Sequence, residues 1–550
     1  MDAREQSNGI PGSAEPGAWA PLAEPTFRAL WLAFLVGNIG TWVHDVAAAW
    51  LMAEQTGSAF MVAAVQAATT LPVVLFAIVA GTLADIVDRR KYLVAAQAWM
   101  CLCASSLALL AHFGTVTPWT LVAFTFALGT GAAMAMPAQQ ALTPTLVPRP
   151  MLGAAVALGS LSMNIARAIG PALGGLVMAW SGAAMAFAIN AASFLVLAIV
   201  LLRWRPAPAS SALPRETFGA ALRAGLRYAS RAGVFQAVLV KSGMFFLTAS
   251  AFTALLPIVV NQDLGASAGT YGLLLGCIGA GAVGGAVLMP RVRARLGPDR
   301  SVALATLAYA ACIAGLAMIR ELPWLYLVSL LAGTAWITIL SSFHVAAQTS
   351  VPAWVRARAL ALYIVVFSAG LAAGSLGWGG LAHAIGTEGA LLVAAVGTIG
   401  AALIGTRFSL GAAGRVDLAP SGHWPSPALA EDVAGERGPV LVTLEYQVPL
   451  ERRDEFLALA RELGSVRRRN GALHWGIVED VAAPGTHLEY FIDASWLEHL
   501  REHERVTGED RRLQETLLAL VETPPRVRHF VGGRPGSPVR PLPQGVGGLT

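Results

Sequence analysis

Three strongly ionisable side chains stand inside long apolar stretches of this sequence: Asp45, Arg167 and Lys241. A charge in apolar surroundings is costly unless it is paired or faces water, so such residues commonly mark ion or substrate pathways. A carboxyl group in such a position can bind and release a proton, and a nearby cation can favour its ionised form. These three residues are candidates for binding a proton, an ion or a substrate. Which of these roles applies depends on the segments in which they lie.

The composition points to a membrane protein. The 550-residue chain is 55% hydrophobic and only 13% charged, whereas about a quarter of the residues in soluble domains carry charge, so a soluble globular enzyme is nearly excluded. Residues 92–148 contain no Asp, Glu, Lys or Arg, and such a stretch fits two membrane spans of roughly 20 residues each. Backbone polar groups in hydrocarbon must be bonded internally, so the apolar stretches are predicted to form helices.

Twelve transmembrane helices are predicted, and the basic residues of their short loops indicate the orientation. Alternate loops place seventeen basic residues on one side and Arg320 alone on the other. The positive-inside rule makes the first side cytoplasmic, with both termini in the cytosol. The same loop bias accounts for the net charge of +5, so no nucleic-acid partner is expected. Arg-rich, Lys-poor usage suggests a GC-rich bacterium and its cytoplasmic (inner) membrane.

The two halves of the membrane region resemble each other at an offset of about 204 residues, which places Gly175 opposite Gly379. Two related halves are typical of transporters with a site between them. The predicted fold is an all-α polytopic membrane protein with two six-helix pseudo-repeats, followed by a small α+β ferredoxin-like cytoplasmic domain. The predicted boundaries are a cytoplasmic N-terminal tail (1–26), an N-terminal bundle (27–203), a cytoplasmic linker (204–232), a C-terminal bundle (233–410), a second linker (411–439), the ferredoxin-like domain (440–531) and a disordered tail (532–550).

Depth in the membrane links Asp45 with Arg167. Rising about 1.5 Å per residue from the cytoplasmic ends of their helices, both side chains lie roughly 20 Å into a core of about 30 Å. They could meet, and two interpretations stay open. Asp45 could carry a coupled proton under the influence of Arg167, or the two could form a permanent buried ion pair. Asn38 and Lys241 are candidates for the substrate cavity, although Lys241 could instead reach the cytoplasmic surface.

The segment GTLADIVDRRK, from Gly81, has the residues of a cytoplasmic gate. Gly81 would allow close helix approach, and Asp85 with the basic cluster of Arg89 and Arg90 could form a charge-assisted network. The segment resembles the loop between helices 2 and 3 of the major facilitator superfamily, except that Asp88 replaces a usual glycine. The alternative is a simple positive-inside loop.

A glycine pattern marks the predicted fifth helix. Gly159, Gly170, Pro171, Gly174 and Gly175 form G-x10-G-P-x2-G-G, which would give a smooth face for tight packing and one interrupted hydrogen bond. The pattern is similar to the motif associated with antiporters of the superfamily, and this resemblance implies export against an inward ion gradient. The alternative is a close helix contact with no role in coupling.

The C-terminal region has a soluble composition and predicts the order β-α-β-β-α-β, which is ferredoxin-like. An exposed sheet face would favour dimerisation. His499 and His503 are four residues apart on a predicted helix, a spacing that can bind a metal or haem, and Trp475 and Trp496 could wall a pocket. No third ligand is evident, so no metal site, cofactor or catalytic residue is predicted. The four cysteines form no zinc pattern and are interpreted as small core residues.

Between about Phe27 and Val531 the chain resembles the enterobactin-exporter-like branch of the superfamily, the transmembrane secretion effector family, in segments such as GTWVHDVAAAWLM and NIARAIGPALGG. The resemblance implies a secondary active transporter, not an enzyme, that exports a siderophore-like or hydrophobic drug-like small molecule by proton antiport and alternating access. The alternatives are uptake or facilitated diffusion by the same fold, or a membrane-tethered sensor or oxidoreductase acting through the C-terminal domain.

Overall fold

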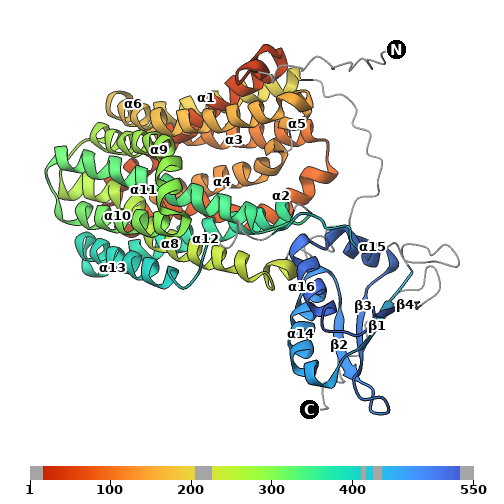
Figure 1. The fold of residues 1–550 in the computed structure, drawn as a ribbon. Helices are drawn as coiled ribbons and strands as arrows, with labels where there is room; N and C mark the ends of the chain where they lie inside the picture. Colours follow the sequence, from red (N-terminus) through yellow and green to blue (C-terminus); the bar gives the residue numbers. More distant parts are fainter. Residues whose placement is uncertain are drawn as a thin grey trace, which may run out of the picture. The chain divides into compact units, whose positions relative to one another are not determined.

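The structure is a computed structural model that describes residues 17–140, 142–204, 226–352, 354–410, 417–424 and 437–532. Most of both predicted tails and of the linker 204–232, and much of the linker 411–439, therefore lie outside the described residues. Two compact units divide the chain. Long helices make up one of them, and the other includes a small four-stranded sheet (Figure 1).

The first bundle consists of long helices, and side chains cap the starts of two of them. Ser58 caps α2, and Asp88 caps α3 by accepting a hydrogen bond from the backbone N–H of Lys91 at 2.9 Å. Side-chain oxygens at these positions satisfy N–H groups that a helix leaves unpaired. The elements are α1 (Pro25–Thr56), α2 (Ala59–Ile86), α3 (Arg89–His112), α4 (Pro118–Gln140), the short α5 (Thr143–Leu146) and α6 (Leu152–Arg203).

The 52 residues of α6 contain two membrane crossings. At about 1.5 Å per residue a straight helix of this length would extend about 78 Å, more than twice the hydrocarbon thickness. Gly182 divides it, with φ of 73° in a conformation that favours glycine. Eleven described helices are long and apolar enough to span a membrane, and the division of α6 makes twelve crossings, as predicted.

The second bundle repeats the pattern of the first. Its elements are α8 (Gly233–Ile258), which continues into the π-helical turn η3 (Val259–Asp263), then α9 (Ala268–Leu296), α10 (Pro298–Met318), α11 (Leu322–Thr349), α12 (Arg356–Ile385) and α13 (Thr387–Gly405). The protein is thus a multi-pass membrane protein.

The C-terminal domain is an antiparallel sheet in the order β2-β3-β1-β4. Its elements are β1 (Val440–Gln447), α14 (Arg453–Asn470), β2 (His474–Glu479), β3 (Thr486–Asp493), α15 (Trp496–Arg505), α16 (Gly508–Leu518) and β4 (Arg526–Val531). The predicted order of strands and helices is present, with the second helix divided into α15 and α16. Residues of β1, including Val442 and Leu444, pack with Phe456 of α14 to form the core.

Part of the predicted second linker belongs to this domain. Pro420 forms a β-bridge with Thr507, and the Trp424 indole donates a hydrogen bond to Gln514 of α16 at 2.9 Å. Residues 417–424 therefore pack against the junction of α15 and α16 and extend the domain beyond its predicted start.

Candidate functional site

The glycine pattern of α6 forms a close contact with α1. A Cβ atom added at Gly170 would lie 2.5 Å from the Trp42 Cβ, and one at Gly174 would lie 3.0 Å from the Val43 Cα. Since real Cβ atoms do not approach other atoms this closely, larger residues would force the helices apart. Two glycines of the motif therefore fix the spacing of α1 and α6.

The last glycine of the motif joins the two bundles. A Cβ atom at Gly175 would lie 2.6 Å from the Gly272 Cα of α9, and one at Gly272 would lie 2.8 Å from the Pro171 carbonyl oxygen. The repeat produces a second contact of the same kind, because a Cβ atom at Gly379 of α12 would lie 2.4 Å from the Ala63 Cβ of α2. Glycines at equivalent positions of the two halves thus each contact the opposite half.

Two other glycines, which the sequence predicts to lie at close helix contacts, have no close neighbour among the described residues. No atom of the described residues lies within 4 Å of a Cβ atom added at Gly159 or at Gly81. Gly159 lies in the first turns of α6, before that helix reaches α9, and Gly81 lies near the end of α2. Three glycines of the motif, Gly170, Gly174 and Gly175, therefore pack against neighbouring helices. Gly159 makes no such contact with the described residues.

Asp45 and Arg167 do not form an ion pair in the described part of the chain. Gly170 lies level with Trp42, Arg167 precedes Gly170 by three residues, and Asp45 follows Trp42 by three residues. At about 1.5 Å per residue the two charged residues are offset by about 9 Å along the helices. Counting residues from the start of each helix predicts equal depths, because the count does not include how α1 and α6 are shifted along each other.

Asp45 lies close enough to Tyr271 of α9 for its carboxylate to influence ionisation of the phenol. The same tyrosine ring stacks on the Trp50 indole of α1 with ring centroids 6.0 Å apart. Asp45 of the first half therefore interacts with a residue of the second half, close to Gly272. His44, its neighbour in sequence, is buried against Phe187, with ring centroids 4.9 Å apart.

The two predicted cavity residues have different surroundings. Asn38 is half-buried on α1, seven residues before Asp45 and so on the same helical face. Lys241 forms an ion pair with Asp299, with its Nζ 3.0 Å from Oδ1, and donates a hydrogen bond to the Phe408 carbonyl oxygen at 2.8 Å. An anionic substrate at Lys241 would have to compete with these partners.

The gate loop begins α3 and holds the end of α6. Arg90 donates hydrogen bonds to the carbonyl oxygens of Leu201 and Leu202, which have no partners within their own helix. Asp88, at the usual glycine position, supplies the cap of α3. The Asp85 side chain lies outside the described residues, so its predicted network with Arg89 and Arg90 remains a prediction.

The soluble domain encloses charged side chains between its sheet and its helices. Glu489 accepts hydrogen bonds from Tyr446 at 2.7 Å, Trp475 at 2.9 Å and Arg467 at 3.2 Å, and Arg467 and Glu489 are each 2% exposed. Trp475 therefore belongs to this network. Trp496 instead packs beside His499, with ring centroids 5.3 Å apart.

Comparison with protein families identifies the chain. The transmembrane secretion effector family matches residues 16–535. The chain belongs to this family. The match includes both bundles and the soluble domain, so this member of the major facilitator superfamily is a membrane transporter.

Curated relatives agree with the family. The enterobactin exporter EntS of Escherichia coli O1:K1 is 27% identical over 367 residues, which are 65% of this chain and 85% of the exporter. The staphyloferrin A transporter of Staphylococcus aureus is 23% identical over 266 residues, 47% of this chain. The match spans 65% of that transporter, slightly less than two thirds of its length.

Solved structures show the same fold at low sequence identity. A bacterial homologue of the human lysosomal transporter Spinster, in an inward-facing and unoccupied conformation, is similar with a TM-score of 0.55 and 15% identity over 72% of this chain and 97% of that one. A POT family transporter in complex with 5-aminolevulinic acid has a TM-score of 0.58 and 12% identity, and covers 72% of this chain and 98% of its own.

Proposed function

We propose that this transporter exports a siderophore-like or hydrophobic drug-like small molecule across the bacterial inner membrane, with both termini in the cytosol, by proton antiport and alternating access. The cargo class and direction are supported by relatives named as an enterobactin exporter and a staphyloferrin A transporter. The basic residues of alternate loops support the orientation.

The interaction of Asp45 with Tyr271 carries the proposal for coupling. Asp45 is on α1 of the first half and Tyr271 is on α9 of the second. A charged carboxylate at this position interacts with the other half, and binding of a proton removes the negative charge. Protonation therefore changes the relative energies of the arrangements in which the two halves are together and apart.

Close glycine contacts between the two halves are compatible with the movement that alternating access requires. Gly175 against Gly272, and Gly379 against Ala63, hold backbones of opposite halves close together without interlocking side chains. Two such contacts at equivalent positions suit a rocking motion of one bundle against the other, because each is relieved by a small rotation. Arg167, which is not paired with Asp45 here, would approach it only in another arrangement of the helices.

The test measures proton flux in proteoliposomes with an imposed pH gradient and a pH-sensitive dye. The cargo panel contains catecholate siderophores, carboxylate siderophores and hydrophobic cations. Wild type is compared with Asp45→Asn and with Glu54→Gln, which removes an exposed carboxyl group from the same helix. We expect a cargo on the panel to drive proton movement in wild type and Glu54→Gln. Asp45→Asn should reduce that movement by about tenfold or more, equivalent to about 1.4 kcal/mol.

Cargo transport that remains fully coupled to protons in Asp45→Asn would contradict the role of Asp45. Cargo transport in wild type with no proton movement would contradict antiport itself. Cargo binding to Asp45→Asn, measured by tryptophan fluorescence, serves as the control for correct folding.

A further inference from the structure

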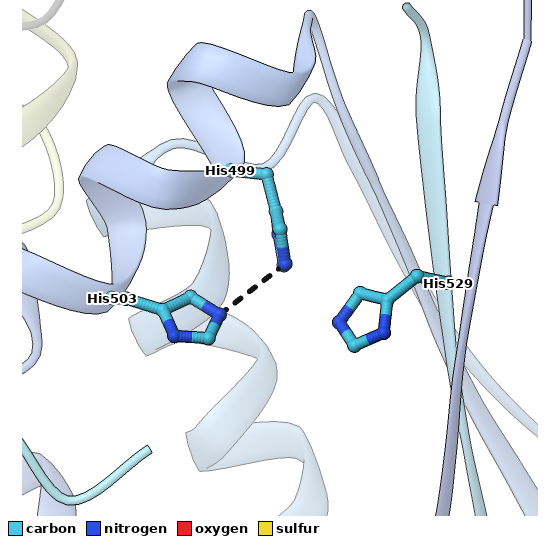
Figure 2. Close-up of side chains that lie close together, drawn as sticks. All are labelled: His499, His503 and His529. Carbon is cyan, nitrogen blue, oxygen red and sulfur yellow. Dashed lines mark hydrogen bonds between the residues drawn. The ribbon is translucent and has the colours of Figure 1, made fainter. Parts of the chain in front are cut away.

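Three imidazoles of the soluble domain face one another (Figure 2). His499 and His503 are one turn apart on α15, and His529 points toward them from β4. One ring nitrogen from each residue lies within 4.8 Å of the other two, and the Nε2 atoms of His499 and His503 are 3.3 Å apart. The sequence suggested the first two residues as a pair, and the structure adds a third.

Strand register explains why His529 joins this cluster. His529 lies opposite Val442 of β1, and Val442 lies opposite Phe491 of β3. Directly opposed residues point to the same face of a sheet. Since Val442 and Phe491 belong to the core beneath the helices, His529 also points toward the helices and reaches the α15 histidines.

His499 is held in the orientation of a metal ligand. Its Nδ1 is 2.9 Å from the Asp493 Oδ2, and both side chains are almost fully buried. An imidazole that donates its Nδ1 proton to a carboxylate presents the lone pair of Nε2, which is the arrangement of carboxylate–histidine–zinc triads. Nε2 is the atom that His499 turns toward His503.

The spacing of the nitrogens fits a tetrahedral ion. With Zn–N bonds of about 2.0–2.1 Å, two ligands of one tetrahedral zinc lie about 3.3–3.4 Å apart. The observed separation of 3.3 Å equals this value, and the bound on all three nitrogens, 4.8 Å, requires only a small inward movement of the third ring.

Burial lowers the pKa of two of the three imidazoles. Burial, with His499 and His529 nearby, lowers the pKa of His503 to about 4. Burial and His499 also lower the pKa of His529. Neutral imidazole is the form that binds metals, and both of these shifts favour it.

A buried carboxyl group, that of Glu502, lies beside the cluster. Its side chain is 0% exposed. Burial, and then the nearby Asp493, raise the pKa of Glu502 well above its usual range. One oxygen from each carboxyl group and a ring nitrogen of His499 lie within 4.8 Å of one another. A cation bound at the histidines would favour the charged form of these nearby carboxyl groups.

We propose that His499, His503 and His529 bind a divalent transition metal of the Zn²⁺ class, with Asp493 orienting His499 and one coordination position left for water or an outside ligand. Imidazole suits zinc, copper, iron and nickel, and three protein ligands with an open fourth position are typical of zinc sites that exchange a ligand. The proposal is independent of the cargo and coupling mechanism of the transporter.

The test uses the full-length protein in detergent, without a histidine tag and stripped by a chelator. Zn²⁺ is titrated in competition with a chromophoric chelator, and Co²⁺ serves as a spectroscopic probe. We expect one metal per chain and tetrahedral Co²⁺ absorption bands. His503→Gln and His529→Gln should each weaken Zn²⁺ binding more than about 100-fold, and Asp493→Asn about 10–100-fold, as for other outer-shell carboxylates. The matched control is His474→Gln, an exposed histidine on β2.

Wild type that binds no more Zn²⁺ than the His503→Gln/His529→Gln double variant would overturn the proposal. Binding reduced equally by His474→Gln would also overturn it. X-ray absorption of zinc-loaded wild type provides an answer that does not depend on variants: about three nitrogen neighbours with imidazole scattering support the site, and their absence contradicts it.

Discussion

At the scale of single residues, Glu489 shows how a charge is accommodated in the soluble domain. Its two carboxylate oxygens receive hydrogen bonds from a guanidinium, a phenol and an indole. Buried polar groups that are hydrogen-bonded to one another in this way favour one arrangement of sheet and helices. Removing one member leaves the others buried without a partner, so the network should respond strongly to small changes.

We predict that Glu489→Gln destabilises the soluble domain by about 3–5 kcal/mol, because the buried charge of Arg467 loses its partner. Glu445→Gln is the control, since Glu445 lies on β1 with its side chain exposed. A change within about 0.5 kcal/mol is expected there. Calorimetry of the full chain should show a lower transition temperature of this domain for Glu489→Gln alone. Equal temperatures for the two variants would contradict the argument.

The sequence predicted some residues of the candidate sites, but not the residues that lie next to them in the fold. The charge of Asp45 within an apolar helix is visible in the sequence, as is the spacing of His499 and His503. The interaction of Asp45 with Tyr271 depends on how α1 packs against α9, and His529 depends on the register of β4 against β1. Both are contacts between segments distant in the chain, and no local pattern encodes them.

At the scale of elements, α6 packs within its own half of the protein and also contacts the other half. Its glycines pack against α1 on one side and against α9 on the other. The sequence predicted the motif and its close packing. It did not distinguish Gly175, which contacts Gly272, from Gly159, which has no described atom within 4 Å of an added Cβ. Identical glycines in one helix differ only in what lies opposite them.

This difference gives a prediction with an internal control. Gly175→Ala places a methyl group where only 2.6 Å separates it from the Gly272 Cα, so α6 and α9 must move apart. We expect cargo transport to fall by about tenfold or more, a cost of about 1.4 kcal/mol at the transport barrier. Gly159→Ala makes the same change in the same helix without a clash and should be neutral or stabilise by up to about 1 kcal/mol. Transport by proteoliposomes and thermal stability in detergent measure both effects, and equal transport by the two variants would be inconsistent with the contact.

Apolar run lengths and loop charges predicted twelve crossings, and the structure confirms the number. The lengths of individual elements were harder to predict. Gly182 joins the fifth and sixth crossings without a loop. Residues 417–424, which the sequence assigns to a linker, pack against the soluble domain. A backbone angle and a docking contact decide these features, whereas composition alone treats both segments as loops.

At the scale of the whole molecule, the close contacts between halves make a cross-linking experiment possible. A Cβ atom at Gly269 of α9 would lie 3.9 Å from the Ala179 Cβ of α6, close to the spacing of about 3.8 Å found in disulfides. We predict that oxidation of an Ala179→Cys/Gly269→Cys variant, with the four native cysteines replaced, stops transport and that reduction restores it. If the halves rock apart here during each cycle, a covalent bond traps one state.

The two single-cysteine variants, treated with the same oxidant, are the controls and should transport normally. Full transport by the oxidised double variant, with the cross-link verified on a gel, would mean that this contact persists throughout the cycle. The separation of the two halves would then have to occur elsewhere.

The position of His529 also has a consequence for how the protein is made. His529 lies on β4, the last strand among the described residues, and α15, which carries the other two histidines, precedes it. During synthesis the three ligands cannot be assembled until both bundles have been translated. A metal held there would therefore be acquired only after β4 has been made, and a protein truncated before β4 could keep every membrane crossing while lacking the complete site.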